Sequence, residues 1–407
     1  MPPRSFHDPA FHSQLIDLLG YCHRQAAQVD EVLGTVARIV DGDSDSWLNE
    51  WMSTAGTVWA AAIQAEQHDR GQAVAHYRRA ATYYAAALLR VLNSSEPERR
   101  PDIWRRQRAC WERMIDLAPG TAERLAIAYE GTTLPGFFFP ATDAAVDESR
   151  PLIIINNRTG EPTSQAWVNG GAAAAARGYH WMTFDGPGFE AALVNQGLLL
   201  RPDWEAVLTP VVDAMLSRPD VDPSRIAVLG VGMGGYLAVR AICFEHRLAA
   251  AVADPGVVDA STAWTDALSD PMRRLLKTGA RTAFEREVHL TELFAPDAAA
   301  CMRLRGAPFG LADGSWYALY QRIGRYRLAG EIEQIRTPVL VLETDPDQPW
   351  RGQSRRLYDR LPGRKCLIEL AAPQDGDLAG AQSAASARET RIYEWLEQRL
   401  GTGQPSF

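Results

Sequence analysis

The chain carries two patterns of hydrophobic and polar residues, which meet near residue 124. From about residue 11 to residue 123, apolar and alanine residues recur at spacings of three and four, as in 58–63 and 76–89. Such spacing places them on one face of a helix. A cluster of Asp, Gly and Ser at 41–46 is typical of a turn and N-cap before a helix that carries Trp47 and Trp51. We therefore predict an N-terminal helical domain over residues 1–123.

The remainder, residues 124–407, alternates short apolar runs with helical patterns such as 168–176 and 203–216. Runs buried on both faces and joined by helical crossovers are typical of a mostly parallel, doubly wound α/β sheet. The interval 259–333 is too long for a simple connection and has helical patterns of its own, so we predict a helical insertion there. Seven runs are expected to form strands: 136–139, 152–155, 180–184, 226–229, 250–253, 339–342 and 366–370.

Charge and composition narrow the classes of partner. Lys and Arg number 42 against 50 Asp and Glu, a net charge of −8 that argues against nucleic acid or an anionic membrane. The N-terminus lacks the apolar segment of a secretory signal, and no apolar run reaches the roughly 18 residues of a membrane span. Five scattered cysteines show no metal-ligand spacing and predict no disulfide framework. We expect a cytoplasmic protein with a small-molecule partner and neither metal nor cofactor.

Residues 225–240 read as a strand, a glycine-rich turn and a helix. In a G-x-S-x-G elbow, such a turn lifts a nucleophilic side chain above the sheet. Here the central position is Gly232, which has no side chain. The same glycines also fit the G-x-G-x-x-G of a dinucleotide-binding loop, with Asp254 after the next strand. Because this strand is not the first of the predicted sheet, we prefer the elbow interpretation.

Further motifs accompany the elbow between residues 134 and 400. They are Leu-Pro-Gly at 134–136, the loop 156–160, Phe-Asp-Gly-Pro-Gly at 184–188, the segment 218–223, Asp-Pro-Gly at 254–256 and Gly-Gln-Ser at 352–354. On these motifs the chain resembles the α/β-hydrolases with an N-terminal helical domain, the group of 2,6-dihydroxypseudooxynicotine hydrolase and the fermentation–respiration switch esterases. The resemblance implies an α/β-hydrolase fold, a helical domain that covers the active site, and a possible homodimer.

The resemblance also implies a catalytic triad in the chain order nucleophile, acid, histidine. The nucleophile maps to Gly232 and the histidine to about Ala379, and no histidine follows His289 anywhere in the chain. The acid is expected after the strand 339–342, where Asp345 is preferred and Asp347 comes next. Because acyl transfer to serine needs both a nucleophile and a base, we predict that the protein is not a conventional serine esterase.

An elbow without a nucleophile can still help to bind an oxyanion, because the backbone N–H after the nucleophile position normally points into an oxyanion hole. This position is Met233, and Asn157 and Thr159 lie in the loop expected to supply a second donor. Such a hole stabilises an enolate whether or not a serine has attacked. Arg158 in the same loop is suited to hold a carboxylate, phenolate or carbonyl oxygen. A solvated surface position for Arg158 is an equal alternative.

Other side chains are candidates for proton transfer. Asp345 and Asp347 would serve as general bases if an apolar pocket raised their pKa, and the alternative is a solvated loop. His23, His68 and His76 lie in the predicted helical domain, from which one could supply a replacement base. A packed or surface histidine is the default for each.

Tryptophan is abundant, with 12 residues, and some tryptophans fall in segments expected near the pocket mouth. Trp167, Trp264 and Trp350 there would suit a flat aromatic substrate, and ordinary core packing is the alternative for each. We therefore predict an enzyme that uses a hydrolase pocket for a non-hydrolytic step on a small aromatic or polyketide-like metabolite. Dehydration, cyclisation and carbon–carbon bond making or breaking all fit. The alternative is a catalytically inactive pseudo-hydrolase that binds a metabolite or a protein partner.

Overall fold

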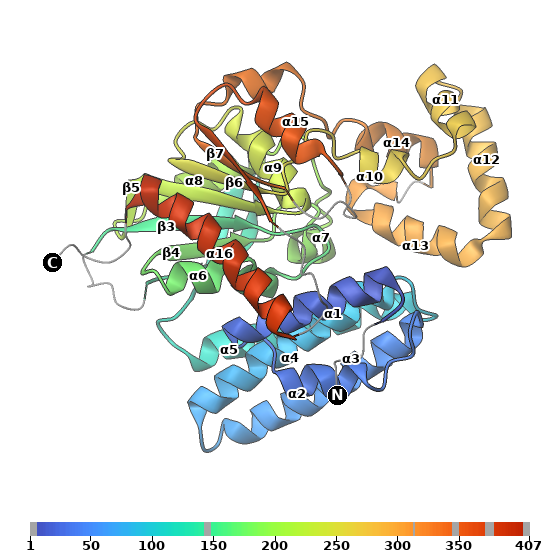
Figure 1. Cartoon of the computed structure of the whole chain (residues 1–407). Coiled ribbons are helices and arrows are strands. Elements are labelled where there is room, and N and C mark those ends of the chain that lie inside the picture. Colours follow the sequence, from blue (N-terminus) through green and yellow to red (C-terminus); the bar gives the residue numbers. More distant parts are fainter. Residues whose placement is uncertain (1–5, 142–147, 312–313, 344–349, 371–377, 402–407) are drawn as a thin grey trace.

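A central sheet organises the molecule (Figure 1). The computed structural model describes residues 6–141, 148–311, 314–343, 350–370 and 378–401. The sheet has eight strands in the order β1-β2-β4-β3-β5-β6-β7-β8, of which β2 runs antiparallel to β1 and β4 while the other pairs are parallel. The strands are β1 Glu123–Tyr129, β2 Thr132–Phe139, β3 Arg150–Asn156, β4 His180–Phe184, β5 Val221–Val231, β6 Ala250–Asp254, β7 Val339–Glu343 and β8 Lys365–Glu369. The predicted fold class is confirmed, and each of the seven predicted runs lies on a strand.

The two faces of the sheet are covered by different helices. Successive residues of β3 point to opposite faces, so Ile154 joins one hydrophobic cluster and Ile155 the other. The first face packs against α8 and α9, and the second against α6, α16 and the N-terminal helices. The helices of this α/β region are α6 Ala172–Ala175, α7 Glu190–Gln196, α8 Glu205–Leu216, α9 Met233–Ile242, α15 Gln353–Arg360 and α16 Leu378–Leu400.

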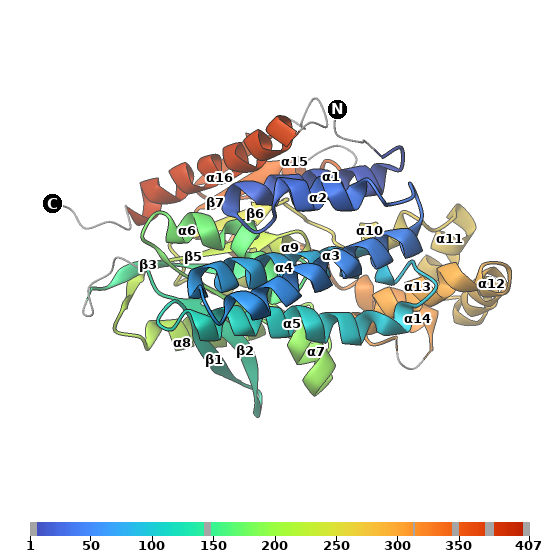
Figure 2. The same cartoon turned by 90° about the horizontal axis from the view of Figure 1, so that it is seen from below.

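In the described part of the chain, five α-helices precede β1 and form a layer that lies below the sheet in Figure 1 and in front of it in Figure 2, which is seen from below. They are α1 Pro9–Tyr21, α2 Val29–Val36, α3 Ser44–Ala65, α4 Arg70–Val91 and α5 Arg100–Leu117. The carboxylate of Asp43 caps α3 by accepting the N–H groups of Asp45 and Ser46 at 2.9 and 3.1 Å, as the turn-forming cluster predicts. Trp47 and Trp51 of this helix are fully buried.

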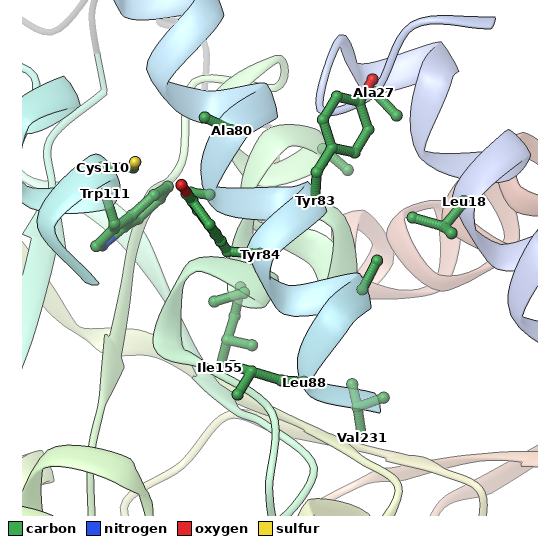
Figure 3. Close-up of a cluster of buried hydrophobic side chains, with 14 of the residues drawn as sticks. Leu18, Ala27, Ala80, Tyr83, Tyr84, Leu88, Cys110, Trp111, Ile155 and Val231 are labelled. Atoms are coloured by element: carbon green, nitrogen blue, oxygen red, sulfur yellow. The ribbon is translucent and has the colours of Figure 1, made fainter. Parts of the chain in front are cut away.

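Hydrophobic contact joins this helical layer to the end of the sheet where β3 and β5 finish. In Figure 3, Leu88 of α4 lies beside Ile155 of β3 and Val231 of β5. Trp111 of α5 packs against Phe139 of β2 with ring centroids 5.9 Å apart. The helices and the sheet therefore share one core, and the helical layer is seated next to the turn that follows Val231.

Two buried ion pairs reinforce the same junction. Arg108 of α5 donates to the Asp185 carboxylate at 3.0 Å, and Arg100 donates to Glu190 at 2.6 Å. The hydroxyl of Thr163 also donates to Asp185, at 2.6 Å. Asp185 is 2% exposed, so this carboxylate is dehydrated and held by partners on both sides of the junction. These contacts give Asp185, in the Phe-Asp-Gly-Pro-Gly turn, a structural role at the junction.

A helical segment separates β6 from β7 and projects to one side of the sheet (Figure 1). It contains α10 Thr262–Thr265, α11 Asp270–Thr278, α12 Arg281–Phe294, α13 Pro296–Gly306 and α14 Trp316–Ile323. Phe284, Trp316 and Leu319 belong to a small hydrophobic cluster of its own. The boundaries of a helical domain at 1–123, a core at 124–407 and an insertion at 259–333 remain our interpretation of this arrangement.

Within the described part of the chain, no helix is long and apolar enough to cross a membrane. The same residues hold no group of three or more His, Cys, Asp or Glu side chains arranged to bind a metal ion. All five cysteines are free.

The turn after β5 yields a first prediction, because Gly234 lies against backbone. A Cβ atom there would stand 2.1 Å from the carbonyl oxygen of Asn156. We expect Gly234→Ala to lower the free energy of unfolding by at least about 3 kcal/mol. The clash is between the backbone at Gly234 and the backbone at Asn156, and neither segment can move without disturbing its own packing. Urea unfolding measures the change. Gly34→Ala is the control: Gly34 lies inside α2 with nothing within 4 Å of its added Cβ, so helix propensity should raise stability by about 0.5–1 kcal/mol. Equal effects of the two changes would contradict this packing argument.

The domain junction yields a second prediction. Asp185→Asn removes one of the two carboxylates that pair with Arg108, whose side chain is only 15% exposed, and leaves Glu112 as the other; we expect a loss of about 1.5–3 kcal/mol in the free energy of unfolding. Asp102→Asn on the same helix breaks an ion pair that is 67% exposed at its carboxylate and should change stability by less than about 1 kcal/mol. Urea unfolding of both variants tests the difference, and a loss below about 1 kcal/mol for Asp185→Asn would show that the junction does not depend on this pair.

Candidate functional site

The turn between β5 and α9 has the geometry of an elbow. Gly232 stands between Val231, the last residue of β5, and Met233, the first of α9, with φ 60° and ψ −125°. Its N–H donates to the carbonyl oxygen of Asp254 at the end of β6, at 2.7 Å. Side chains rarely adopt such a positive φ, so the backbone here is held in a conformation that favours glycine. The register of β3, β5 and β6 brings Asn156, Gly230 and Asp254 to the same edge of the sheet.

Close backbone packing explains the other glycines of this turn. An added Cβ at Gly230 would meet the carbonyl oxygen of Gly234 at 2.2 Å, and one at Gly235 would meet that of Pro255 at 2.4 Å. The G-x-G-x-x-G spacing therefore follows from the tight contact of β5 and α9 with the neighbouring loops. This favours the elbow over a dinucleotide-binding loop.

Gly232 differs from its neighbours because a side chain, rather than backbone, occupies the space beside it. An added Cβ at Gly232 would lie 2.4 Å from Cγ of Arg158, 3.0 Å from its Cδ and 3.3 Å from its Cβ. The methylene groups of Arg158 thus fill the place next to the elbow where a nucleophilic side chain would begin. The sequence places Gly232 and Arg158 in two separate loops, and the fold brings them into contact.

Arg158 lies beside the elbow with its side chain partly exposed to solvent. Its side chain is 47% exposed, and the guanidinium stands 3.7 Å from the Glu161 carboxylate. Desolvation by the surrounding protein acts to lower the pKa of Arg158, but the negative charges of Glu161 and Asp17, with Tyr21 and Asp254, raise it above the ordinary value. Arg158 is therefore a permanently charged cation beside the elbow.

A second arginine closes the other side of the site. Arg388 of α16 donates from Nε to the carboxylate of Asp254 at 2.5 Å, and Asp254 is 4% exposed. Helix α1 packs closely against the same helix, since an added Cβ at Gly20 would meet Cβ of Ala385 at 3.3 Å. The N-terminal helix, the C-terminal helix and the end of β6 therefore converge beside the elbow.

Helix α1 presents Asp17 and Tyr21 to this region. The two residues are four positions apart and so share a face of the helix. Both interact electrostatically with Arg158, Glu161 and Arg388. Desolvation raises the pKa of Asp17 and raises that of Tyr21 well above its ordinary value. Together the charged and ionisable side chains around Gly232 form what we call the elbow cluster: Asp17, Tyr21, Arg158, Glu161, Asp254 and Arg388.

The loop after β3 is held by its own polar contacts. The Asn157 side chain is buried, donates to the Thr163 carbonyl at 3.4 Å and accepts from Asn169 at 3.2 Å. Asn169 also donates to Glu161 at 3.1 Å, which fixes the partner of Arg158. Thr159, also predicted to bind substrate, is half-buried in the same loop. The backbone N–H of Met233 begins α9, where the first N–H groups of a helix have no intrahelical acceptor. An oxyanion-binding role for Met233, Asn157 and Thr159 remains a prediction.

The three candidate tryptophans belong to three different hydrophobic clusters. The indole N–H of Trp167 donates at 3.1 Å to a backbone carbonyl after α1. Trp264 packs edge-on against Phe309 with centroids 5.6 Å apart. The indole N–H of Trp350 donates to the Ala260 carbonyl at 3.1 Å. Each thus makes structural contacts, and their part in binding a substrate stays a prediction.

The candidate histidines of the helical layer have separate surroundings. His23 lies 3.1 Å from Glu389, and this hydrogen bond raises the pKa of the imidazole. His76 stands 2.7 Å from Arg79, and burial lowers its pKa. His68 is exposed in the turn after α3.

The predicted acids and the position of the predicted histidine lie in or next to segments outside the residues that the structure describes. Asp345 and Asp347 lie outside the described residues, so their role as acid or base stays a prediction. Ala379 falls in the first turn of α16.

Sequence reasoning missed Asp17, Tyr21 and Arg388. The spacing of Asp17 and Tyr21 marks one helix face, but only the fold places that face over the elbow.

Comparison with known proteins gives the family. The profile of the family described as "Esterase FrsA-like" matches residues 17–268, more than half of the chain. The Hydrolyase ccsE of Aspergillus clavatus is 31% identical over 98% of both chains. The 20-hydroxy-prefusarin hydrolase FUS2 of Gibberella moniliformis is 31% identical over 61% of both chains. For the first curated relatives that it matches, the chain likewise spans only 58–61% of the relative's length.

A solved structure agrees at the level of the fold. That of 2,6-dihydroxy-pseudo-oxynicotine hydrolase aligns with 94% of this chain and 95% of its own, with a TM-score of 0.68 and 18% identity. The matched relatives are named as enzymes, and the structural match confirms the α/β-hydrolase fold with its N-terminal helical region. The chain belongs to the FrsA-like esterase family.

Proposed function

We propose that this protein is an enzyme that catalyses a non-hydrolytic step on a small aromatic or polyketide-like metabolite. The observation that carries the proposal is the position of Arg158, whose methylene groups fill the space next to Gly232. Acyl transfer to an enzyme nucleophile needs a hydroxyl or thiol at this point and a base beside it. Gly232 supplies no such group, and a cationic side chain has taken its place.

Arg158 suits chemistry that develops negative charge on a substrate oxygen. Its raised pKa keeps the guanidinium charged at any working pH. Charge-assisted hydrogen bonds from this group would stabilise an enolate or phenolate more than the neutral ground state. The N–H of Met233 is the second donor in this proposal. Dehydration, cyclisation and carbon–carbon bond making or breaking each have a route through such an oxyanion when the reacting carbon is next to a carbonyl group.

The relatives support a small-molecule substrate. The Gibberella moniliformis relative is named for its action on 20-hydroxy-prefusarin. Its name also says hydrolase, so the proposed reaction departs from that of the relative because of Gly232 and Arg158. A small-molecule partner agrees with the acidic net charge of this chain, −8.

A second candidate function is binding without turnover, by a catalytically inactive member of the family. The same observation favours it, because a glycine at the elbow removes covalent catalysis. The two functions differ in whether a bound metabolite is converted. Extracts of the producing organism, incubated with the protein and followed by mass spectrometry, separate binding from conversion.

A third prediction tests the proposal directly. A fluorophosphonate probe, which labels active-site serines, should leave the intact mass of the protein unchanged because no nucleophile stands at the elbow. The metabolite converted in the extract should gain no ¹⁸O in H₂¹⁸O.

Arg158→Gln should lower kcat/KM for that metabolite about 10²–10³-fold, the usual cost of one oxyanion donor.

The control for this experiment is Arg105→Gln, which removes a guanidinium that is 66% exposed on α5 and should leave kcat/KM unchanged. Stoichiometric labelling by the probe, or solvent oxygen in the product, would contradict a non-hydrolytic reaction. Binding of a metabolite without any conversion would instead support the second candidate function.

A further inference from the structure

The loop after β3 places a carboxylate beside Arg158 at more than hydrogen-bond distance. A turn joins the two residues, and in it the N–H of Glu161 donates to the Arg158 carbonyl at 3.3 Å. Gly160, the third residue of the turn, has φ 82°, a value that favours glycine. The Glu161 carboxylate nevertheless stands 3.7 Å from the guanidinium, whereas Arg100 contacts Glu190 at 2.6 Å. Arg158 and Glu161 therefore form an ion pair without a direct hydrogen bond.

The other oxygen of the Glu161 carboxylate is held by Asn169. The Asn169 amide donates to Oε2 of Glu161 at 3.1 Å, while Oε1 faces the guanidinium of Arg158. The same amide nitrogen donates to Oδ1 of Asn157 at 3.2 Å. Asn169 is 7% exposed, and the Glu161 side chain is 13% exposed. One buried amide group thus holds a residue on each side of Arg158 in the sequence.

The direction of these hydrogen bonds is set by groups that can only accept. Because the Thr163 carbonyl has no proton to donate, Nδ2 of Asn157 faces it, at 3.4 Å, and Oδ1 of Asn157 faces Asn169. Asn169 must therefore present its NH₂ group to Asn157. The Glu161 carboxylate, which also only accepts, takes the other N–H of that group. An amide at position 169 is required for both contacts.

Packing fixes the backbone around Asn169. This residue lies in a short π-helical turn, Trp167–Gly171. The Tyr393 hydroxyl of α16 donates to the Gly170 carbonyl in this turn at 2.7 Å. An added Cβ at the last residue of the turn would meet the ring of Trp181 at 2.7 Å, so the turn rests directly on β4. Asn169 is therefore held by α16 and β4, which lie outside the loop that it contacts.

We infer that Asn169 is a positioning residue, which holds Glu161 back from Arg158 and so keeps the guanidinium free for a carboxylate, enolate or phenolate oxygen of the ligand. The inference rests on the proposed function, since it explains how Arg158 stays available for that oxygen. Arg158 is 47% exposed, so a ligand can reach it. Without Asn169, the Glu161 carboxylate would close on Arg158, because charge-assisted N–H···O bonds are favourable at about 2.7–2.9 Å. Glu161 would then occupy the donors that the substrate oxygen needs.

The fourth prediction concerns the affinity for an anion and needs no turnover. Benzoate is the probe, because its carboxylate is charged at pH 7, and calorimetry measures its binding. Asn169→Ala should weaken the binding about 3–10-fold, the equivalent of one partly exposed ion pair, because the released Glu161 competes for Arg158. Glu161→Gln should strengthen it about 2–5-fold, because the competing charge is gone. The double variant should bind as tightly as Glu161→Gln alone.

The double variant decides how Asn169 acts. An equal loss of affinity on adding Asn169→Ala to the wild type and to Glu161→Gln would mean that Asn169 only supports the fold, and would overturn the inference. Benzoate that binds neither the wild type nor Glu161→Gln would also overturn it, since Arg158 would not be available to a ligand oxygen. Binding that survives Arg158→Gln unchanged would place the anion elsewhere, with the same consequence.

Two further variants guard against a folding defect. Ser164→Ala is the matched control: Ser164 is also 7% exposed and accepts a hydrogen bond from Gln107, but it lies outside the chain of contacts that ends at Glu161. It should leave the affinity for benzoate within about twofold of the wild type. Asn169→Asp keeps the volume but offers no donor to Glu161, so binding should weaken. Adding Glu161→Gln to it restores a donor–acceptor pair with the roles exchanged and should restore the binding.

Turnover separates this inference from the proposed function. Asn169→Ala should raise KM for the converted metabolite about 3–10-fold, and it should have no further effect when Arg158→Gln is already present. If Asn169→Ala changes neither KM nor kcat while Arg158→Gln lowers kcat/KM as expected, the restraint on Glu161 is not needed and only this inference fails. If no metabolite is converted, the benzoate measurements still decide the role of Asn169.

Discussion

The contact between Gly232 and the side chain of Arg158 is the constraint on which the rest of the site depends. A Cβ at the elbow would overlap Cγ of Arg158 at 2.4 Å, so Arg158 can adopt this position only because Gly232 has no side chain. The remaining glycines of the turn are required by backbone contacts that belong to the fold. Gly232 is therefore required by the site, whereas the neighbouring glycines of the turn are required for β5 to pack against α9.

The helical layer is as much a part of the site as the sheet. Hydrophobic packing of α4 and α5 on β2, β3 and β5 seats it, and the buried pairs of Arg108 with Asp185 and Arg100 with Glu190 fix its orientation. Through α1 this layer also packs against α16, which carries Arg388 to the carboxylate of Asp254.

Much of the fold could be predicted from the sequence, because buried strands are continuous apolar runs and elbow glycines mark a strand-to-helix turn. β1 is absent from the predicted strands: its sequence mixes charged and small residues, and only Ile127 and Tyr129 are buried on it. Gly232 and Arg158 were both identified from their loops. Their contact, and the approach of Asp17, depend on how α1, α16 and the sheet pack together. The spacing of apolar residues along the chain does not predict this packing.

Replacement of a nucleophile by an arginine changes which part of the scaffold must supply the base. In a serine enzyme the base lies close to the nucleophile, because it must take the hydroxyl proton. A reaction that starts by removing a proton from the substrate instead needs its base on the far side of the ligand from the oxyanion donors, so that charge flows from one to the other. Arg158 stands on the elbow side, and helix α1 packs against α16, whose Arg388 reaches Asp254 at the same edge of the sheet. The helical layer is the element able to place a base on the far side of the ligand. It therefore links Gly232, which has no side chain, to the charged face of α1.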